Sequence, residues 1–181
     1  LEWHKKLFKL GKKIGIKVFS TPFDEAAVDF LEKLNCPFYK ISSFEMTDLG
    51  LIKKISQTGK PVIISTGTSS LNEIERSFKI AKKFGSKDIS LLYCVSNYPA
   101  KISDFNLNNI KILKEKFKCK VGLSDHSKTH SVAAAAALVG AEIFEKHICL
   151  KNSNSLDSSF SISGNDILNY KKAIKQSYAL L

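Results

Sequence analysis

Six short apolar runs, each followed by a stretch with helical periodicity, constrain the fold of this chain more than any other feature. The runs are rich in β-branched and aromatic residues, as buried strands are. They span 16–22, 38–44, 61–67, 89–95, 120–126 and 142–148. The amphipathic stretches span 24–34, 47–59, 70–85, 105–117, 131–141 and 165–181, and a further helix is expected at 1–13. Strands that alternate with helices predict an α/β fold with a parallel sheet.

Local signals support these boundaries, most clearly in the stretch 70–85. The segment begins with "SLNE", in which Ser70 and Glu73 have the spacing of a capping box. It ends at Gly85, the residue type that most often follows the last turn of a helix. We therefore expect a capped helix between these two points.

Polar residues at the ends of the runs distinguish two parallel architectures. A doubly wound sheet binds its ligand at one switch point, so only two or three strand ends need polar groups. In a (β/α)8 TIM barrel, the C-terminal ends of all strands converge on one site. Here every run ends in polar groups: Ser20 and Thr21; Ser42 and Ser43; Ser65 and Thr66; Ser96 and Asn97; Ser124, Asp125 and His126; Glu145, Lys146 and His147. The pattern favours the barrel.

The barrel predicted from the 181 residues is incomplete. A complete barrel has about 250 residues and eight strands, whereas the sequence supplies about six βα units. Because a helix precedes the first run, we expect the missing strands at the N-terminus, and we interpret 1–181 as a partial TIM-barrel domain. Such a piece would have open sheet edges. We therefore expect it to be inactive alone and prone to self-association.

Charge and hydropathy exclude several classes of protein. The net charge is +11, but all 28 basic residues except Arg76 are lysines, and they are scattered along helical stretches. Specific nucleic-acid readers favour arginine, so we predict no nucleic-acid partner and a lysine-rich surface that attracts an anionic substrate. No apolar run reaches the roughly 18 residues that a membrane span needs. Four isolated cysteines, Cys36, Cys94, Cys119 and Cys149, indicate reduced thiols in a cytoplasmic protein.

Two histidines occupy matching places near the ends of the last two runs. If these strands are neighbours, about 4.8 Å separates them, and His126 and His147 can share one divalent ion. The alternative is a pair of buried histidines that bind no metal, and spacing alone does not decide between the two.

A lysine inside an otherwise apolar run is the other unusual feature. Lys40 would be a buried ammonium, which needs an anionic partner. That partner could be Glu45, or Lys40 could form a Schiff base with a carbonyl substrate. The "STG" segment at 65–67 offers hydroxyl and backbone N–H groups near a helix N-terminus, which suits a phosphate.

Taken together, six segments resemble the sialic acid synthase family. They are "STPFDEAAVDFLEKL", "YKISSFEMTDLGLIKKI", "GKPVIISTG", "VSNYP", "GLSDHS" and "EKHICL". The resemblance implies a transferase that condenses phosphoenolpyruvate with an N-acetylated amino sugar, giving a nonulosonic acid and phosphate. "KISSFEMTD" and "DSSFS" are closer to pseudaminic acid synthases than to N-acetylneuraminate synthases. The acceptor would then be an open-chain 2,4-diacetamido-2,4,6-trideoxyhexose, with N-acetylmannosamine as the other choice.

The resemblance also assigns roles to the matching residues. The catalytic residues would be Lys40, Glu45, His126 and His147. The substrate-binding residues would be Lys40 and Ser43 on phosphoenolpyruvate, Glu45 and Asp157 on the sugar, Ser65 and Ser124 on the phosphate, and Ser96 and Tyr98 along the walls. His126 and His147 would bind Mn²⁺ or Mg²⁺ as a Lewis acid for the sugar aldehyde.

The family also has a C-terminal antifreeze-like domain, which we expect to lie outside these 181 residues, and the resemblance implies a homodimer. Two rival functions stay open. One is a Schiff-base aldolase that uses Lys40 on a similar barrel and needs no metal. The other is a non-catalytic barrel fragment, which would not bind phosphoenolpyruvate.

Overall fold

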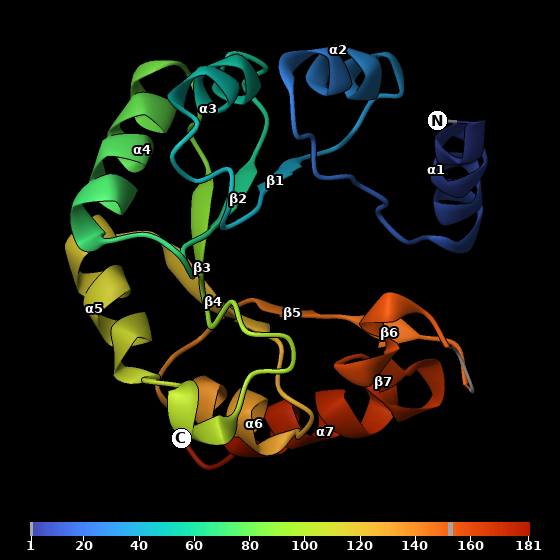
Figure 1. Ribbon diagram of the computed structural model, residues 1–181, viewed down its shortest axis with the longest axis vertical. Coiled ribbons are helices and arrows are strands. Elements are labelled where there is room, and N and C mark those ends of the chain that lie inside the picture. Colours follow the sequence, from blue (N-terminus) through green and yellow to red (C-terminus); the bar gives the residue numbers. More distant parts are fainter. Residues whose placement is uncertain (1, 152–153) are drawn as a thin grey trace. The chain divides into compact units, whose positions relative to one another are not determined.

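The computed structural model of the chain describes residues 2–151 and 154–181 (Figure 1). The chain divides into two compact units. The first unit comprises Leu1–Ser65 and Ser69–Ser90, and the second comprises Thr66–Thr68 and Leu91–Leu181. Leu1, which begins the helix expected at 1–13, lies outside the described residues.

The described residues form a five-stranded sheet whose strand order follows the chain. Its strands are β1 (Tyr39–Ile41), β2 (Val62–Ser65), β3 (Ile89–Cys94), β4 (Lys120–Asp125) and β5 (Phe144–Lys146). β1 pairs with β2, and β4 with β5, both in parallel. The predicted α/β fold with a parallel sheet is therefore confirmed. A doubly wound sheet reverses its strand order at a switch point, and this sheet does not.

In the first unit, four helices accompany β1 and β2: α1 (Glu2–Ile14), α2 (Glu25–Lys33), α3 (Leu49–Ser56) and α4 (Leu71–Lys83). α3 packs against both α2 and α4. The capping box predicted for α4 is present, because the Ser70 hydroxyl accepts from the Glu73 N–H and the Glu73 carboxylate accepts from the Ser70 N–H. The helix ends before Gly85, which has φ of 119°. The boundaries predicted for α4 from these short-range patterns are therefore confirmed.

In the second unit, α5 (Asn108–Phe117) and α6 (Ser131–Leu138) pack on β4. α6 in turn packs along α7 (Ile167–Tyr178), and the two helices lie side by side in Figure 1. Three 3₁₀ turns complete the unit: η1 (Ile102–Asp104), η2 (Leu156–Ser159) and η3 (Gly164–Asp166). Ala133, Ala136 and Ala137 of α6 are fully buried, because alanines allow close approach to the sheet and to α7.

The first predicted strand, 16–22, is wrong. After α1 these residues run without strand structure, and no strand in the described part of the chain pairs with them. A β-strand exists only through its ladder of hydrogen bonds to a neighbour. Apolar and β-branched composition alone cannot supply that neighbour, so the sheet of the described residues has five strands where the sequence predicts six.

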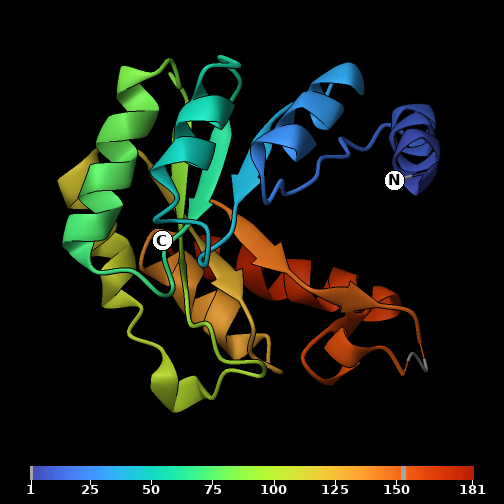
Figure 2. The ribbon, with the colours of Figure 1, turned by 45° about the horizontal axis from the view of Figure 1, so that its top comes forward.

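The last predicted strand, 142–148, is split in two. β5 ends at Lys146, and β6 (Ile148–Cys149) pairs with β7 (Ile162–Ser163) in a separate two-stranded sheet. Figure 2 shows β5 and β6 as successive arrows along one extended segment. His147 therefore lies between two strands, because the residues that follow it change partner.

Two further expectations concern the whole chain. None of the described helices is long and apolar enough to cross a membrane. All four cysteines are thiols, with Cys36 and Cys94 buried and Cys119 and Cys149 half-buried.

Candidate functional site

The two histidines singled out by the sequence lie together at the C-terminal ends of β4 and β5. The last paired residues of these strands are Asp125 and Lys146, which stand opposite one another in the ladder. His126 and His147 each follow one residue later, so the strand register carries them to the same level. Their ring centroids are 5.4 Å apart, with the rings inclined at 61°.

His126 is held by a backbone carbonyl. Its Nδ1 lies 2.7 Å from the Val95 carbonyl oxygen, which can only accept, so Nδ1 carries the proton and Nε2 keeps its lone pair. The side chain is buried. Burial lowers the pKa of His126, and the nearby His147 adds to the lowering, while the hydrogen bond to Val95 acts in the opposite direction. A neutral imidazole is the form that binds metals.

His147 is oriented by the segment that follows β6. Its Nδ1 lies 3.5 Å from Oδ2 of Asp157 in η2. The ring of Phe160, just after η2, meets the His147 ring edge-on at a centroid distance of 5.0 Å. Each histidine thus has its Nδ1 beside an oxygen acceptor, and Nε2 is the ring nitrogen that could bind a ligand.

A serine and a glutamate occupy the same face of the β4–β5 pair as the histidines. Ser124 and Glu145 are paired in the ladder, and the Ser124 hydroxyl donates to Oε1 of Glu145 over 2.6 Å. The same hydroxyl lies 3.4 Å from Nε2 of His126. Sequence reasoning gave Glu145 no role, although its place two residues before His147 on the same strand face was the available signal.

Aromatic rings cover the histidines. Tyr98 lies against His126 with a centroid distance of 4.2 Å, and it meets Phe160 edge-on at 5.0 Å. Burial raises the pKa of the Tyr98 hydroxyl, and nearby acidic groups raise it further. Tyr98 was predicted to line the site, whereas Phe160 was not singled out. No pattern along one strand links Phe160 to its ring partners His147 and Tyr98, which lie 13 and 62 positions earlier.

Ser96 follows β3 and lies near a glycine that makes room for it. A Cβ on Gly67 would stand 2.4 Å from the Ser96 hydroxyl and 2.5 Å from Sγ of Cys94. Only a glycine fits this approach. Gly67, the last residue of the "STG" segment, thus packs directly on the end of β3.

The donor set fits a divalent ion that takes further ligands from outside the chain. Metal-bound histidines usually donate their second ring N–H to a carbonyl or carboxylate. Here Nδ1 of His126 donates to the Val95 carbonyl, and Nδ1 of His147 lies 3.5 Å from the Asp157 carboxylate. In residues 2–151 and 154–181, no three His, Cys, Asp or Glu side chains are grouped as a metal site. Substrate or water oxygens would therefore complete the coordination of an ion at the two Nε2 atoms.

The remaining predicted residues lie in the first unit. Lys40 in β1 and Ser43 just after it are buried. β1 ends at Ile41 and a turn follows, so strand alternation does not extend to Glu45, whose carboxylate accepts from the Ser42 hydroxyl. At the end of β2, the Ser65 hydroxyl is buried and has no hydrogen-bond partner among the described residues. An unsatisfied hydroxyl is what a serine that binds a ligand would show without it.

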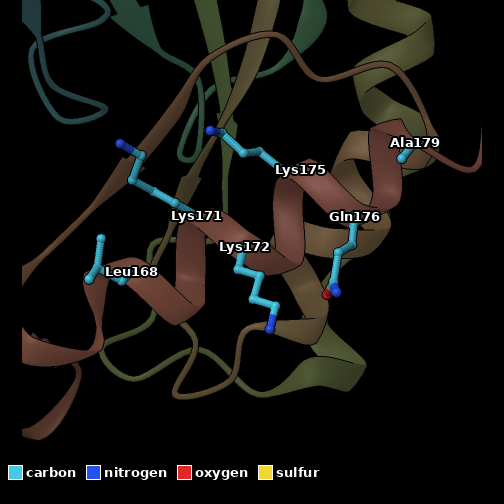
Figure 3. A pocket seen from close by; sticks show the side chains of 6 residues that line it. All are labelled: Leu168, Lys171, Lys172, Lys175, Gln176 and Ala179. Carbon is cyan, nitrogen blue, oxygen red and sulfur yellow. The ribbon is translucent and has the colours of Figure 1, made fainter.

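A separate surface pocket lies along α7 and contains none of the predicted site residues. Figure 3 shows the side chains that line it, which come from α7 and the residue after it. They are Leu168, Lys171, Lys172, Lys175, Gln176 and Ala179. The histidine cluster is therefore a different feature of the second unit.

Comparisons with known proteins agree with the resemblance seen in the sequence. The profile of the NeuB family matches residues 1–181. A pseudaminic acid synthase of Helicobacter pylori is 43% identical over 182 residues, covering 100% of this chain and 54% of the relative. An N,N'-diacetyllegionaminic acid synthase of Campylobacter jejuni is 39% identical over 170 residues, covering 92% of this chain and 51% of the relative.

Among solved structures, the N-acetylneuraminic acid (sialic acid) synthetase of Leptospira borgpetersenii, crystallised with citrate, superposes with a TM-score of 0.95. It is 32% identical, and the match covers 99% of this chain and 63% of that one. The chain thus spans about half the length of the curated relatives it matches.

Proposed function

The chain belongs to the NeuB family, and we propose that it serves a synthase that condenses phosphoenolpyruvate with an N-acetylated amino sugar. The acceptor is an open-chain 2,4-diacetamido-2,4,6-trideoxyhexose, and the product is a pseudaminic acid-like nonulosonate. This choice is supported by two pseudaminic acid synthases at 43% and 38% identity. It is also supported by the segments "KISSFEMTD" and "DSSFS".

The observation that carries the proposal is the pair of histidines whose Nδ1 atoms face Val95 O and Asp157. His126 and His147 hold Mn²⁺ or Mg²⁺. When bound, such an ion supplies a Lewis acid for the aldehyde oxygen of the sugar. The proposal extends to an eight-stranded (β/α)8 barrel in the whole protein, to a homodimer, and to a cytoplasmic location, in keeping with the thiol state of the cysteines.

The other residues bind and orient the two substrates. In the reaction, C3 of phosphoenolpyruvate attacks the aldehyde carbon, water adds at C2, and phosphate leaves by cleavage of its C–O bond. Lys40 and Ser43 bind the carboxylate or phosphate of phosphoenolpyruvate. The hydroxyls of Ser65 and Ser124 donate to its phosphate, so that a small anionic substrate is fixed by charge and by hydrogen bonds.

Three polar side chains and one aromatic ring serve the sugar. Glu45 and Asp157 accept hydrogen bonds from its hydroxyl or amide groups, and Asp157 is exposed enough to do so while it faces His147. Ser96 and Tyr98 form walls, and the partly exposed ring of Tyr98 offers an apolar surface to the acetyl groups.

Removal of either histidine tests the proposal in the full-length protein. We expect His126→Ala and His147→Ala each to weaken Mn²⁺ binding by at least about 10-fold and to abolish turnover, because each removes one of two protein ligands. Titration calorimetry measures the first effect, and phosphate release from phosphoenolpyruvate plus the trideoxyhexose measures the second. His130→Ala is the matched control. This half-buried histidine pairs with Asp166 over 2.7 Å and has no part in the proposed metal site, so its removal should leave Mn²⁺ binding unchanged.

Two results would contradict the proposal. Unchanged Mn²⁺ binding in both histidine variants would remove the metal site. Turnover that survives EDTA, together with a borohydride-trapped adduct at Lys40, would replace the synthase with the Schiff-base aldolase.

A further inference from the structure

A buried network lies on the face of the β4–β5 pair opposite the histidines. Oδ2 of Asp125 lies 3.3 Å from Nζ of Lys146 and accepts from the Tyr170 hydroxyl over 3.1 Å. The Asp125 side chain is 0% exposed and the Lys146 side chain 5%. Tyr170, which comes from α7, is also buried. We call Asp125, Lys146 and Tyr170 the strand-end network.

The network also holds the backbone on both sides of His126. Oδ1 of Asp125 accepts from the Ser127 N–H over 2.8 Å, and the Lys146 ammonium donates to the Ser127 carbonyl. Residues 125 and 127 are thus both tied to the network, while His126 points to the other face. The His126 carbonyl in turn accepts from the Ala100 N–H over 3.0 Å.

Stability alone does not account for an ion pair in this place. Bringing two charges out of water costs about as much as their attraction returns, and apolar residues of similar size are often as stable. The ion pair instead fixes the register of β5 against β4. Asp125 and Lys146 stand opposite each other in the ladder, and any slip of β5 along β4 would separate them and leave both charges buried without each other.

Register at this point decides where the histidines lie. Asp125 and Lys146 form the last rung of the ladder, and the next residue on each strand is His126 or His147. We propose that the strand-end network is a positioning set, which fixes the ends of β4 and β5 so that the two imidazoles face one ion. The inference rests on the proposed metal site. It adds three residues that touch neither substrate nor metal.

The test compares Mn²⁺ affinity in variants of the full-length protein. Tyr170→Phe removes one hydroxyl from the network, and Lys146→Met removes its cation. We expect Tyr170→Phe to raise the Kd for Mn²⁺ by roughly 3- to 10-fold. This is a smaller effect than the loss of a group that contacts a metal ligand directly. Lys146→Met should raise the Kd further. Titration calorimetry well below the unfolding midpoint gives the Kd, and thermal unfolding of the metal-free protein shows that each variant is folded.

Tyr39→Phe is the matched control. The Tyr39 hydroxyl also donates to a carboxylate, Oε1 of Glu32, over 2.5 Å, and its side chain is fully buried. Loss of this hydroxyl should lower the unfolding midpoint while the Kd for Mn²⁺ stays within about twofold of wild type. A purely structural role of the strand-end network would give Tyr170→Phe the same result.

The outcomes separate this inference from the proposed function. If His126→Ala loses Mn²⁺ while folded Tyr170→Phe keeps the wild-type Kd, the positioning role is overturned and the metal site stands. If His126→Ala and His147→Ala both keep Mn²⁺, the metal site and the inference fail together. Should Lys146→Met not fold, Tyr170→Phe still decides, because a Phe ring keeps the packing of the Tyr ring.

Discussion

Two networks in this molecule each combine a carboxylate, a lysine and a tyrosine, and they lie at opposite ends of their strands. In the first unit, Glu32 of α2 accepts from the Tyr39 hydroxyl and pairs with Lys60 over 2.6 Å, and Lys60 lies 5.9 Å from the Tyr39 ring. In the strand-end network, Lys146 likewise lies 5.8 Å from the Tyr170 ring. Burial raises the pKa of both tyrosines, so each hydroxyl stays protonated and donates a hydrogen bond to a carboxylate.

The networks differ in burial and in position along the strands. The side chains of Lys60 and Glu32 are 26% and 36% exposed, whereas those of Lys146 and Asp125 are almost completely buried. Tyr39 is the first residue of β1 and Lys60 precedes β2, while Asp125 and Lys146 are the last residues of β4 and β5. In α/β barrels and sheets, function gathers at the C-terminal strand ends and the other end serves stability. The same chemistry therefore supports the fold in one place and the histidines in the other.

The largest expected difference between the two networks is in the free energy of unfolding that is lost when the lysine of each is removed. Lys146→Met leaves the Asp125 carboxylate buried without its cation and should lower the free energy of unfolding by ~3–5 kcal/mol. Lys60→Met leaves a carboxylate that water reaches, and should cost about 1 kcal/mol or less. Denaturant unfolding of both variants checks the comparison. Equal losses would show that exposure does not distinguish the two networks.

Two glycines extend the comparison to the backbone. A Cβ on Gly122 in β4 would stand 2.1 Å from the Ile143 carbonyl oxygen, so Gly122→Ala must move β4 away from the segment leading into β5. We expect a loss of roughly 1–3 kcal/mol together with weaker Mn²⁺ binding. Gly59, before β2, has φ of 70° and open space around its Cβ position. Gly59→Ala should cost about 1–2 kcal/mol through backbone strain.

Mn²⁺ affinity is the measurement that separates the two glycine variants. Gly59→Ala should leave the Kd unchanged, since it alters neither β4 nor β5, the two strands that the histidines follow. A Kd that changes equally in both variants would mean that metal binding follows overall stability and not the spacing of β4 and β5.

The smallest expected effect is a pH dependence at the histidine end. Burial lowers the pKa of His126 in the folded state, so the unfolded chain binds a proton more readily. Stability from this group is present above the ordinary histidine pKa of about 6.5 and is lost as the pH falls from there through the lowered pKa of the folded state. The free energy of unfolding of the metal-free protein should therefore decrease between about pH 7.5 and about pH 5.5. Denaturant unfolding across this range should show a smaller decrease in His126→Asn, and an identical decrease would contradict the prediction.

Much of the fold could be predicted because it depends on short-range pattern. Short apolar runs rich in β-branched residues identified all five strands of the sheet, and the Ser70 capping box and Gly85 marked the ends of α4. The error at 16–22 has a physical cause, since that segment has strand composition but no partner among the described residues. The break after Lys146 was not predicted, because it depends on the pairing of β6 with β7. Each residue of β7 lies 14 positions later in the sequence than its partner in β6.

At the candidate site, the sequence alone determined which side chains share a face. Two-residue alternation places Ser124 with His126 and Glu145 with His147, and it needs no knowledge of neighbours. Only the tertiary structure decided what these faces meet. Tyr170 is 45 residues from Asp125, Phe160 reaches His147 through a turn, and Val95 orients His126 from another strand end. Burial and partners are properties of packing between distant segments, so residue spacing along one strand cannot specify them.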